Sequence, residues 1–280
     1  MKTNRNIPWR RLADLMAVTV IVITAALTVQ TVWSRPRVLP PTRLANGITY
    51  EGLQDSVGFV DLVTVDLRSP NIAVEVGPVV PTIEDHRLFW LPNQMQSERW
   101  AVAVSGGDFT TAWGRYAPAG DRGQPTHALI ANGRTLQRQS SGMLLWFDEY
   151  QTGHIEPATE NSAAWTAARW CVGTRSGLVS QGRVMDPSST TKKRRTCVGL
   201  DQAGCRLHMA TFTSATETEA ATFLSSHGAW NAMELTTAEN AGLVLNANLV
   251  KNWSGIPRGP QRFLTHALVV KTRETVPSHR

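Results

Sequence analysis

Carboxylates are the side chains of this 280-residue chain whose surroundings best suit catalysis. Asp108 follows the glycine pair Gly106-Gly107, and Glu234 and Glu239 lie in a later stretch of two apolar segments joined by a polar loop. Two carboxylates that face each other across a cleft can serve as general acid and general base. Side chains of this type also commonly lie solvated on a protein surface. The residues therefore allow two interpretations, an acid–base site or ordinary surface charges.

Strands must position these carboxylates. The apolar run Ala101–Val104 is typical of a short buried strand that delivers Ser105–Phe109 to its end. Alternating apolar residues in 60–67 and 72–76, with a turn at Ser69–Asn71 between them, predict a hairpin. Further strands are predicted at residues 127–131, 143–147, 197–200, 206–212, 233–235, 243–245 and 266–271.

One helix is predicted from its end signals. Thr216 and Glu219 form the pattern of a capping box, and Gly228 ends the segment. The capping position accounts for Glu219 without a catalytic role. Many strands, few helices and no regular alternation of the two favour an α+β fold with a mixed or antiparallel sheet.

Charge and cysteine content exclude some classes of function. Residues 1–37 contain six cations and one anion, so they account for +5 of the formal net charge of +6, and the rest of the chain is close to neutral. A nucleic-acid-binding surface is therefore not expected. The three cysteines have no zinc-site spacing, so neither a metal nor another cofactor is predicted. A bridge between Cys171 and Cys197 stays open, as does the oligomeric state.

The N-terminal 37 residues resemble an export or anchoring segment. Residues 12–33 are mostly apolar and about as long as a membrane-spanning helix, and four cations precede residue 15. We expect a single-pass anchor in the inner or cell membrane, with the C-terminal domain extracytoplasmic. A cleaved signal peptide is the alternative. A proline-rich linker is predicted at 38–43, the main domain at 44–273 and a tail at 274–280.

The order of four pieces resembles the phosphodiester glycosidase domain family. These pieces are the strand ending in Gly106-Gly107, the stretch Arg195–Gly199, the capped helix at 216–227, and the closing stretch 259–270. The family includes the uncovering enzyme that removes N-acetylglucosamine from sugar phosphodiesters, and bacterial proteins associated with exopolysaccharide metabolism. The resemblance covers residues 44–271 and implies that the ligand is a glycan or a sugar phosphate.

The resemblance also implies where a phosphodiester would bind. Ser105, Gly106 and Gly107 match the start of the family pattern N-G-G-F-F, in which glycines let the backbone approach a ligand and donate N–H groups to it. Arg195 and Thr196 match the family pattern R-T, where a guanidinium can hold a phosphate with two hydrogen bonds. Asp108 takes the position of a family phenylalanine.

The family's acidic, glycine-rich loop D-G-G-G is missing from the chain. Its aspartate falls on Thr236 and its glycines on residues 237–239, and threonine cannot supply the carboxylate that glycoside hydrolysis usually needs. Glu234, Glu239 and Asp108 are the candidates to replace it. Because Glu234 and Thr236 are two residues apart in a predicted strand, we expect their side chains on the same face.

Two further residues belong to the predicted site. His127 takes the place of a family glycine and is either a new acid or base or a partly buried strand residue. Arg262 keeps the family arginine of the last strand, with a salt bridge at the sheet edge as the alternative. The sequence thus leads to three hypotheses: an altered phosphodiester glycosidase, an inactive relative that binds glycan or protein, or a structural envelope subunit.

Overall fold

The computed structural model describes residues 39–55, 58–112, 117–186, 189–246 and 263–272. The predicted membrane anchor at 12–33, Arg262 and the tail at 274–280 lie outside these residues. In the part of the chain that is described, no helix is long and apolar enough to cross a membrane.

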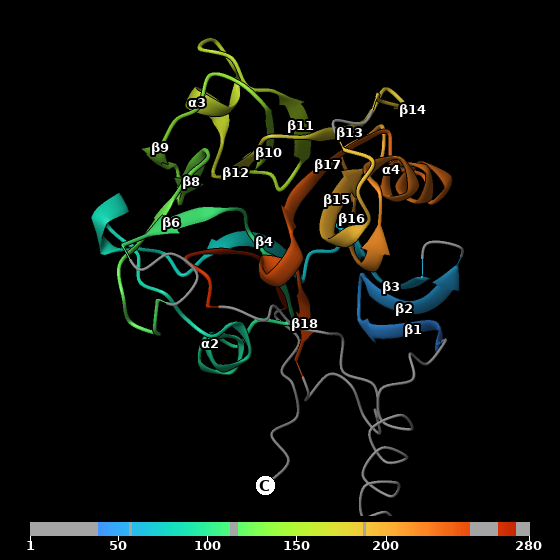
Figure 1. The fold of residues 1–280 in the computed structure, drawn as a ribbon, viewed down its shortest axis with the longest axis horizontal. Coiled ribbons are helices and arrows are strands. Elements are labelled where there is room, and N and C mark those ends of the chain that lie inside the picture. Colours follow the sequence, from blue (N-terminus) through green and yellow to red (C-terminus); the bar gives the residue numbers. More distant parts are fainter. Residues whose placement is uncertain (1–38, 56–57, 113–116, 187–188, 247–262, 273–280) are drawn as a thin grey trace, which may run out of the picture. The chain divides into compact units, whose positions relative to one another are not determined.

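Antiparallel strands dominate the fold (Figure 1). The largest sheet has eight strands in the order β1 (Leu39–Ala45), β2 (Ile48–Asp55), β3 (Gly58–Asp66), β16 (Arg206–Ala215), β15 (Lys193–Leu200), β17 (Asn231–Thr237), β13 (Gly177–Ser180), β14 (Arg183–Val184). The second sheet has the order β11 (Gly153–Pro157), β10 (Met143–Phe147), β12 (Trp170–Thr174), β8 (Leu129–Ala131), β9 (Arg134–Gln137).

Two smaller sheets complete the strand structure. One has the order β18 (Leu243–Leu245), β5 (Val102–Ser105), β19 (Ala267–Thr272), β4 (Ile72–Gly77), and the other pairs β6 (Phe109–Thr111) with β7 (Gly123–Pro125). The helices are α2 (Leu91–Glu98), α3 (Ala164–Ala167) and α4 (Glu217–Ser226), with 3-10 turns η1 (Ile83–Asp85) and η3 (Ala238–Asn240).

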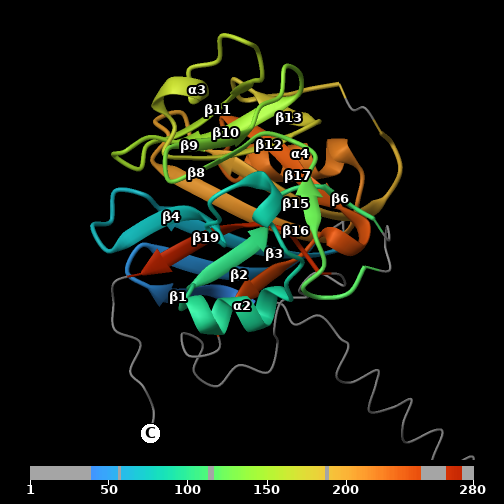
Figure 2. The same ribbon diagram turned by 90° about the vertical axis from the view of Figure 1, so that its left-hand side faces the viewer.

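The eight-, five- and four-stranded sheets share one apolar core. Their inward side chains form a single buried cluster that includes Val63 of β3, Val104 of β5 and Val172 of β12. Each sheet also has a second apolar cluster on its other face, where α4 packs on the eight-stranded sheet, α2 on the four-stranded sheet and α3 on the five-stranded sheet. Figures 1 and 2 show the helices at these outer faces.

The fold prediction is confirmed for the described residues. The described part of the chain is an α+β arrangement with few helices, and every strand pair in it is antiparallel, as in the pairing of β15 with β16 and with β17. The strands predicted at 143–147 and 243–245 match β10 and β18. The capping box is present at α4, where the Thr216 hydroxyl accepts from the Glu219 N–H and the Glu219 carboxylate accepts from the Thr216 N–H.

Three local predictions were wrong. The segments 60–67 and 72–76 are strands, but they do not form a hairpin, because β3 pairs with β2 and β16 whereas β4 pairs with β19. Residues 39–43 are not a linker, because they belong to β1 and pair with β2. The side chains of Leu44 and Ala45 at the end of β1 are buried. Because β1 belongs to the eight-stranded sheet, the folded domain includes it and begins before residue 44. All three cysteines are free thiols.

Candidate active site

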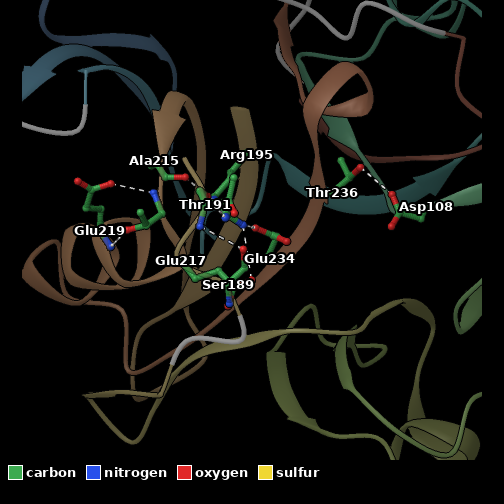
Figure 3. Close-up of polar contacts among 10 residues, drawn as sticks. Asp108, Ser189, Thr191, Arg195, Ala215, Glu217, Glu219, Glu234 and Thr236 are labelled. Atoms are coloured by element: carbon green, nitrogen blue, oxygen red, sulfur yellow. Dashed lines mark hydrogen bonds and ion pairs between the residues drawn. The ribbon is translucent and has the colours of Figure 1, made fainter. Parts of the chain in front are cut away.

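Asp108 and Thr236 face each other at one end of the core (Figure 3). Strand β5 ends at Ser105, and Gly106-Gly107 then lead the chain to Asp108, whose side chain is exposed. Strand β17 supplies Thr236, which is buried, and its Oγ1 donates a 3.0 Å hydrogen bond to Oδ1 of Asp108. Thr236, which cannot supply a carboxylate, is thus hydrogen-bonded to the carboxylate of Asp108 from the segment after β5.

The glycine pair lies against a buried histidine. A Cβ atom on Gly106 would be 2.5 Å from Cδ2 of His266, and one on Gly107 would be 3.2 Å from Nε2 of the same imidazole. The imidazole also shares a 2.8 Å hydrogen bond between its Nδ1 and the hydroxyl of Thr265. Burial lowers the pKa of His266 to about 3, so the ring is neutral at pH 7. The glycines are therefore required, at least in part, by this protein contact.

His127 interacts electrostatically with both Asp108 and Arg175. His127 is half-buried just before β8, and burial lowers its pKa, while the charge of Asp108 opposes this shift and that of Arg175 adds to it. Arg175 is exposed and follows β12, whose Gly173 carbonyl oxygen would be 3.4 Å from a Cβ atom on Gly107. The site therefore contains a carboxylate, a neutral imidazole and a cation.

Arg195 lies in a separate, buried cluster with two glutamates. Its side chain is 1% exposed, its Nη1 donates to Glu234 and lies 3.7 Å from Glu217 Oε1, and its Nε and Nη2 donate to the carbonyl oxygens of Ala215 and Thr191 at 2.7 and 2.9 Å. All three guanidinium nitrogens thus have protein acceptors. This geometry does not leave Arg195 open as the phosphate clamp that the resemblance implies.

The expectation that Glu234 and Thr236 share a face is wrong because β17 contains a bulge. Glu234 pairs with Cys197, whereas Thr236 pairs with Thr196, so Leu235 is an extra residue in β17. Adjacent residues of a regular strand face opposite sides. Thr236 therefore points towards Asp108, and Glu234 points towards Arg195 (Figure 3).

The loop after β17 has a backbone shape that favours glycine at position 238, where this chain has alanine. Ala238, at a family glycine position, has a φ of 54° in the left-handed region. Hydroxyls of two predicted ligand-binding residues hold the chain here, since Ser105 Oγ donates to the Asn240 carbonyl and Thr196 Oγ1 accepts from the Gly242 N–H at 2.8 Å. Glu239 is exposed on η3. Ser105 and Thr196 therefore both brace the loop.

A pocket of about 310 Å³ lies away from this site. It opens on β1, β2, β3 and β16 and is lined by residues such as Arg43, Asp66 and Arg206, none of which belongs to the predicted site. The pocket is thus separate from the residues around Asp108, and we take Asp108, Thr236 and their neighbours as the candidate active site.

Sequence reasoning missed His266, Arg175 and Glu217. His266 occupies the one polar position before the apolar run 267–270, and that isolated imidazole was the available signal. Glu217 is the first residue of the predicted helix, where an acidic side chain is expected for helix stability. Arg175 has no local signal, because its role depends on strand β12 reaching the glycine pair.

The phosphodiester glycosidase family model matches residues 99–271 of this chain. The chain therefore belongs to the phosphodiester glycosidase family, as the sequence resemblance indicated. No curated protein matches it.

Solved structures share the fold at low sequence identity. The zebrafish N-acetylglucosamine-1-phosphodiester alpha-N-acetylglucosaminidase catalytic domain, auto-inhibited by its pro-peptide, has a TM-score of 0.59 and 18% identity over 86% of this chain and 85% of that one. A hypothetical protein from Synechocystis has a TM-score of 0.58 and 16% identity over 86% of this chain and 64% of that one. An exported protein from Burkholderia pseudomallei has a TM-score of 0.57 and 11% identity over 80% and 74%. This chain thus spans less than two thirds of the Synechocystis protein.

Proposed function

We propose that this protein hydrolyses the glycosidic bond of a sugar phosphodiester and that Asp108 supplies the carboxylate. The hydrogen bond between Thr236 and Asp108 carries this proposal. Thr236 occupies the position of the family aspartate, and Asp108 brings a carboxylate to its side from the segment after β5. The zebrafish relative is a phosphodiester glycosidase by name, which supports the same reaction class.

The proposed hydrolysis requires a well-placed carboxylate but little assistance from a general acid. Cleavage of the glycosidic bond builds positive charge on the sugar, which an adjacent carboxylate stabilises directly or by activating water. The departing phosphate monoester is a stable anion whose second pKa is about 6, so its oxygen needs little protonation as it leaves. Thr236 holds Oδ1 of Asp108 in place, which leaves Oδ2 to act on the sugar or the water.

His127 and Arg175 supply the remaining roles in the proposal. A lowered pKa keeps His127 neutral at pH 7, so its imidazole can accept a proton from the attacking water. Arg175 is exposed, acts electrostatically on His127, and provides the cation that attracts a phosphate. Arg195 has no direct part, because its guanidinium is already held by the buried glutamates and two carbonyl oxygens.

A second candidate is a non-catalytic module that binds sugar phosphates or partner proteins. It is favoured by the internal use of Arg195, Ser105 and Thr196, which the family resemblance assigns to ligand binding. Under this alternative, Asp108→Asn would change the affinity for a sugar phosphodiester without any turnover to lose.

The cellular setting also remains a proposal. The apolar segment 12–33 and its flanking cations support a membrane anchor with the catalytic domain outside the cytoplasm and surface glycans as substrates. Alkaline extraction of membranes tests the anchor: the full chain should stay in the membrane pellet, whereas a chain lacking residues 1–37 should be released.

Sugar release from N-acetylglucosamine phosphodiesters tests the activity. The full chain is compared with Asp108→Asn and with Asp66→Asn, which also changes one carboxylate but lies at the separate pocket. We expect Asp108→Asn to lose at least about 100-fold in kcat, as is typical when a catalytic carboxylate or base is removed. No release by the folded full chain from a panel of sugar phosphodiesters would exclude the enzyme and favour the binding module.

A further inference from the structure

The bulge in β17 separates the candidate site from the buried Arg195 cluster. Glu234 lies opposite Cys197, which packs in the apolar cluster beneath α4, whereas Leu235 packs in the central core. After this extra residue, Thr236 lies opposite Thr196. Without the bulge, the alternation of a regular strand would turn Thr236 towards the Arg195 side and away from Asp108.

The contacts of Arg195 hold the part of β17 that precedes the bulge in place. This side chain joins three elements, because it donates to Glu234 of β17, to the Ala215 carbonyl at the end of β16 and to the Thr191 carbonyl before β15. A slip of β17 by one residue would withdraw Glu234 from the guanidinium and leave a carboxylate in a largely buried setting. The ion pair therefore disfavours the register in which Thr236 faces the wrong side.

The segment after the bulge is held independently. Thr196 Oγ1 accepts from the Gly242 N–H, and the Gly242 carbonyl accepts from the Ser105 N–H at 3.2 Å. These contacts fix the loop that follows Thr236 against β5 and β15. The register of β17 is therefore fixed on both sides of Leu235, with the Arg195–Glu234 ion pair on one side and the loop contacts on the other.

We propose that Arg195 and Glu234 are positioning residues whose buried ion pair fixes the bulge at Leu235 and thereby turns Thr236 towards Asp108 (Figure 3). The importance of the Thr236 orientation rests on the proposed function, but the register effect does not. Buried polar groups select one register among alternatives in some coiled coils.

Glu217 offers a matched control. It lies in the same cluster, its side chain is as buried as that of Glu234, and its Oε1 is 3.7 Å from the same guanidinium nitrogen. It belongs to α4 rather than to β17, and its Oε2 accepts a 3.2 Å hydrogen bond from the Ser189 N–H. Glu217→Leu removes a carboxylate from Arg195 without releasing the strand, whereas Glu234→Leu does both.

A methyl NMR experiment on the full chain tests the proposal without substrate. In threonine-methyl-labelled protein, Thr236→Val identifies the Thr236 signal, and the shift of that signal upon Asp108→Asn reports the contact between the two residues. The reporter shift is measured in the parent chain, in Glu217→Leu, in Glu234→Leu, and in the triple variant Arg195→Met, Glu217→Leu, Glu234→Leu. The triple variant removes every charge of the cluster, a change that buried ion clusters often tolerate.

We expect the shift to persist in Glu217→Leu, and to disappear or split into two signals in Glu234→Leu and in the triple variant. An unchanged shift in the folded triple variant would overturn the proposal. Failure of both Glu234→Leu and the triple variant to fold would also overturn it, because the cluster would then support the whole domain and not one register. The expected pattern in a chain that hydrolyses no sugar phosphodiester would refute the proposed function alone.

Discussion

Oγ1 of Thr236 donates a hydrogen bond of 3.0 Å to Oδ1 of Asp108, across 128 residues of sequence. Threonine stands where the family has its loop aspartate, and Asp108 stands where the family has a phenylalanine. Position 236 therefore has no carboxylate of its own but lies next to the carboxylate of Asp108, which comes from a different segment. We propose that Asp108 takes over the role of the family aspartate.

Removal of the Thr236 hydroxyl should lower activity without unfolding the protein. Thr236→Val keeps the side-chain shape but deletes the donor, and a hydrogen bond to a charged group contributes about 1.5–3 kcal/mol. We expect kcat to fall roughly 10- to 100-fold. Thr236→Ser retains the hydroxyl and is the control. Equal rates for Thr236→Val and the parent chain, measured by sugar release, would show that the contact has no role in turnover.

The fit between the glycine pair and His266 should appear as energetic coupling. Gly106→Ala places a Cβ atom 2.5 Å from His266 Cδ2, and overpacking of this kind costs about 1–3 kcal/mol. In a His266→Ala background the same substitution should cost less, because the imidazole no longer fills the space. Urea unfolding of the two single variants and the double variant measures the coupling. Additive effects, within about 0.5 kcal/mol, would contradict the packing described for this loop.

The buried histidines predict a loss of stability in mild acid. Burial lowers the pKa of His266 to about 3 and that of His208 to about 4, whereas both rings in the unfolded chain titrate near 6.5. Their contribution is therefore present above pH 6.5 and is lost as the pH falls towards the lowered values, because the unfolded state takes up protons first. Each should reduce the free energy of unfolding by on the order of 1–2 kcal/mol between pH 6.5 and 5.

His208→Gln isolates one of these two contributions. The difference between the parent and His208→Gln removes the titration of all other groups, so the parent should lose stability faster as the pH falls from 6.5 to 5. Urea denaturation at several pH values provides the measurement. Parallel pH profiles for the two proteins would mean that His208 is not buried as described.

The loop after β17 should accept glycine at position 238. An alanine with left-handed φ is disfavoured by about 1–2 kcal/mol, whereas glycine loses about 0.4–1 kcal/mol more chain entropy on folding. We therefore expect Ala238→Gly to leave stability unchanged or to raise it by up to about 1 kcal/mol, opposite to the usual effect of this substitution. Ala220→Gly in α4 is the control and should destabilise by about 1 kcal/mol from helix propensity, and further because it removes a buried methyl group. Destabilisation of similar size at both positions, in thermal unfolding, would argue against the left-handed conformation.

Local signals in the sequence predicted about half of the described strands and helices. The capping box of α4 involves residues three apart, and the strands β10 and β18 are short apolar runs, so each could be recognised without its neighbours. Strand pairing was harder, since 60–67 and 72–76 have the pattern of a hairpin but join different sheets.

The site was predicted only in part, because its geometry depends on register. Asp108 and Thr236 were both identified as site positions, but their contact joins segments that no local pattern relates. The bulge at Leu235 reverses the face of Thr236, and a bulge depends on the partner strand rather than on the residues of β17 alone. For the same reason, Glu234 and Arg195 were assigned to ligand chemistry, although the structure pairs them with each other.

The most direct test is to move the carboxylate back across the hydrogen bond. Sugar release from an N-acetylglucosamine phosphodiester is measured for the parent chain, Asp108→Ala, and the double variant Asp108→Ala, Thr236→Asp. If Asp108 replaces the family aspartate, Asp108→Ala should lose about 100-fold or more in kcat, and the double variant should regain at least about 10-fold of that loss. Activity in Asp108→Ala equal to that of the parent chain would contradict the assignment of Asp108.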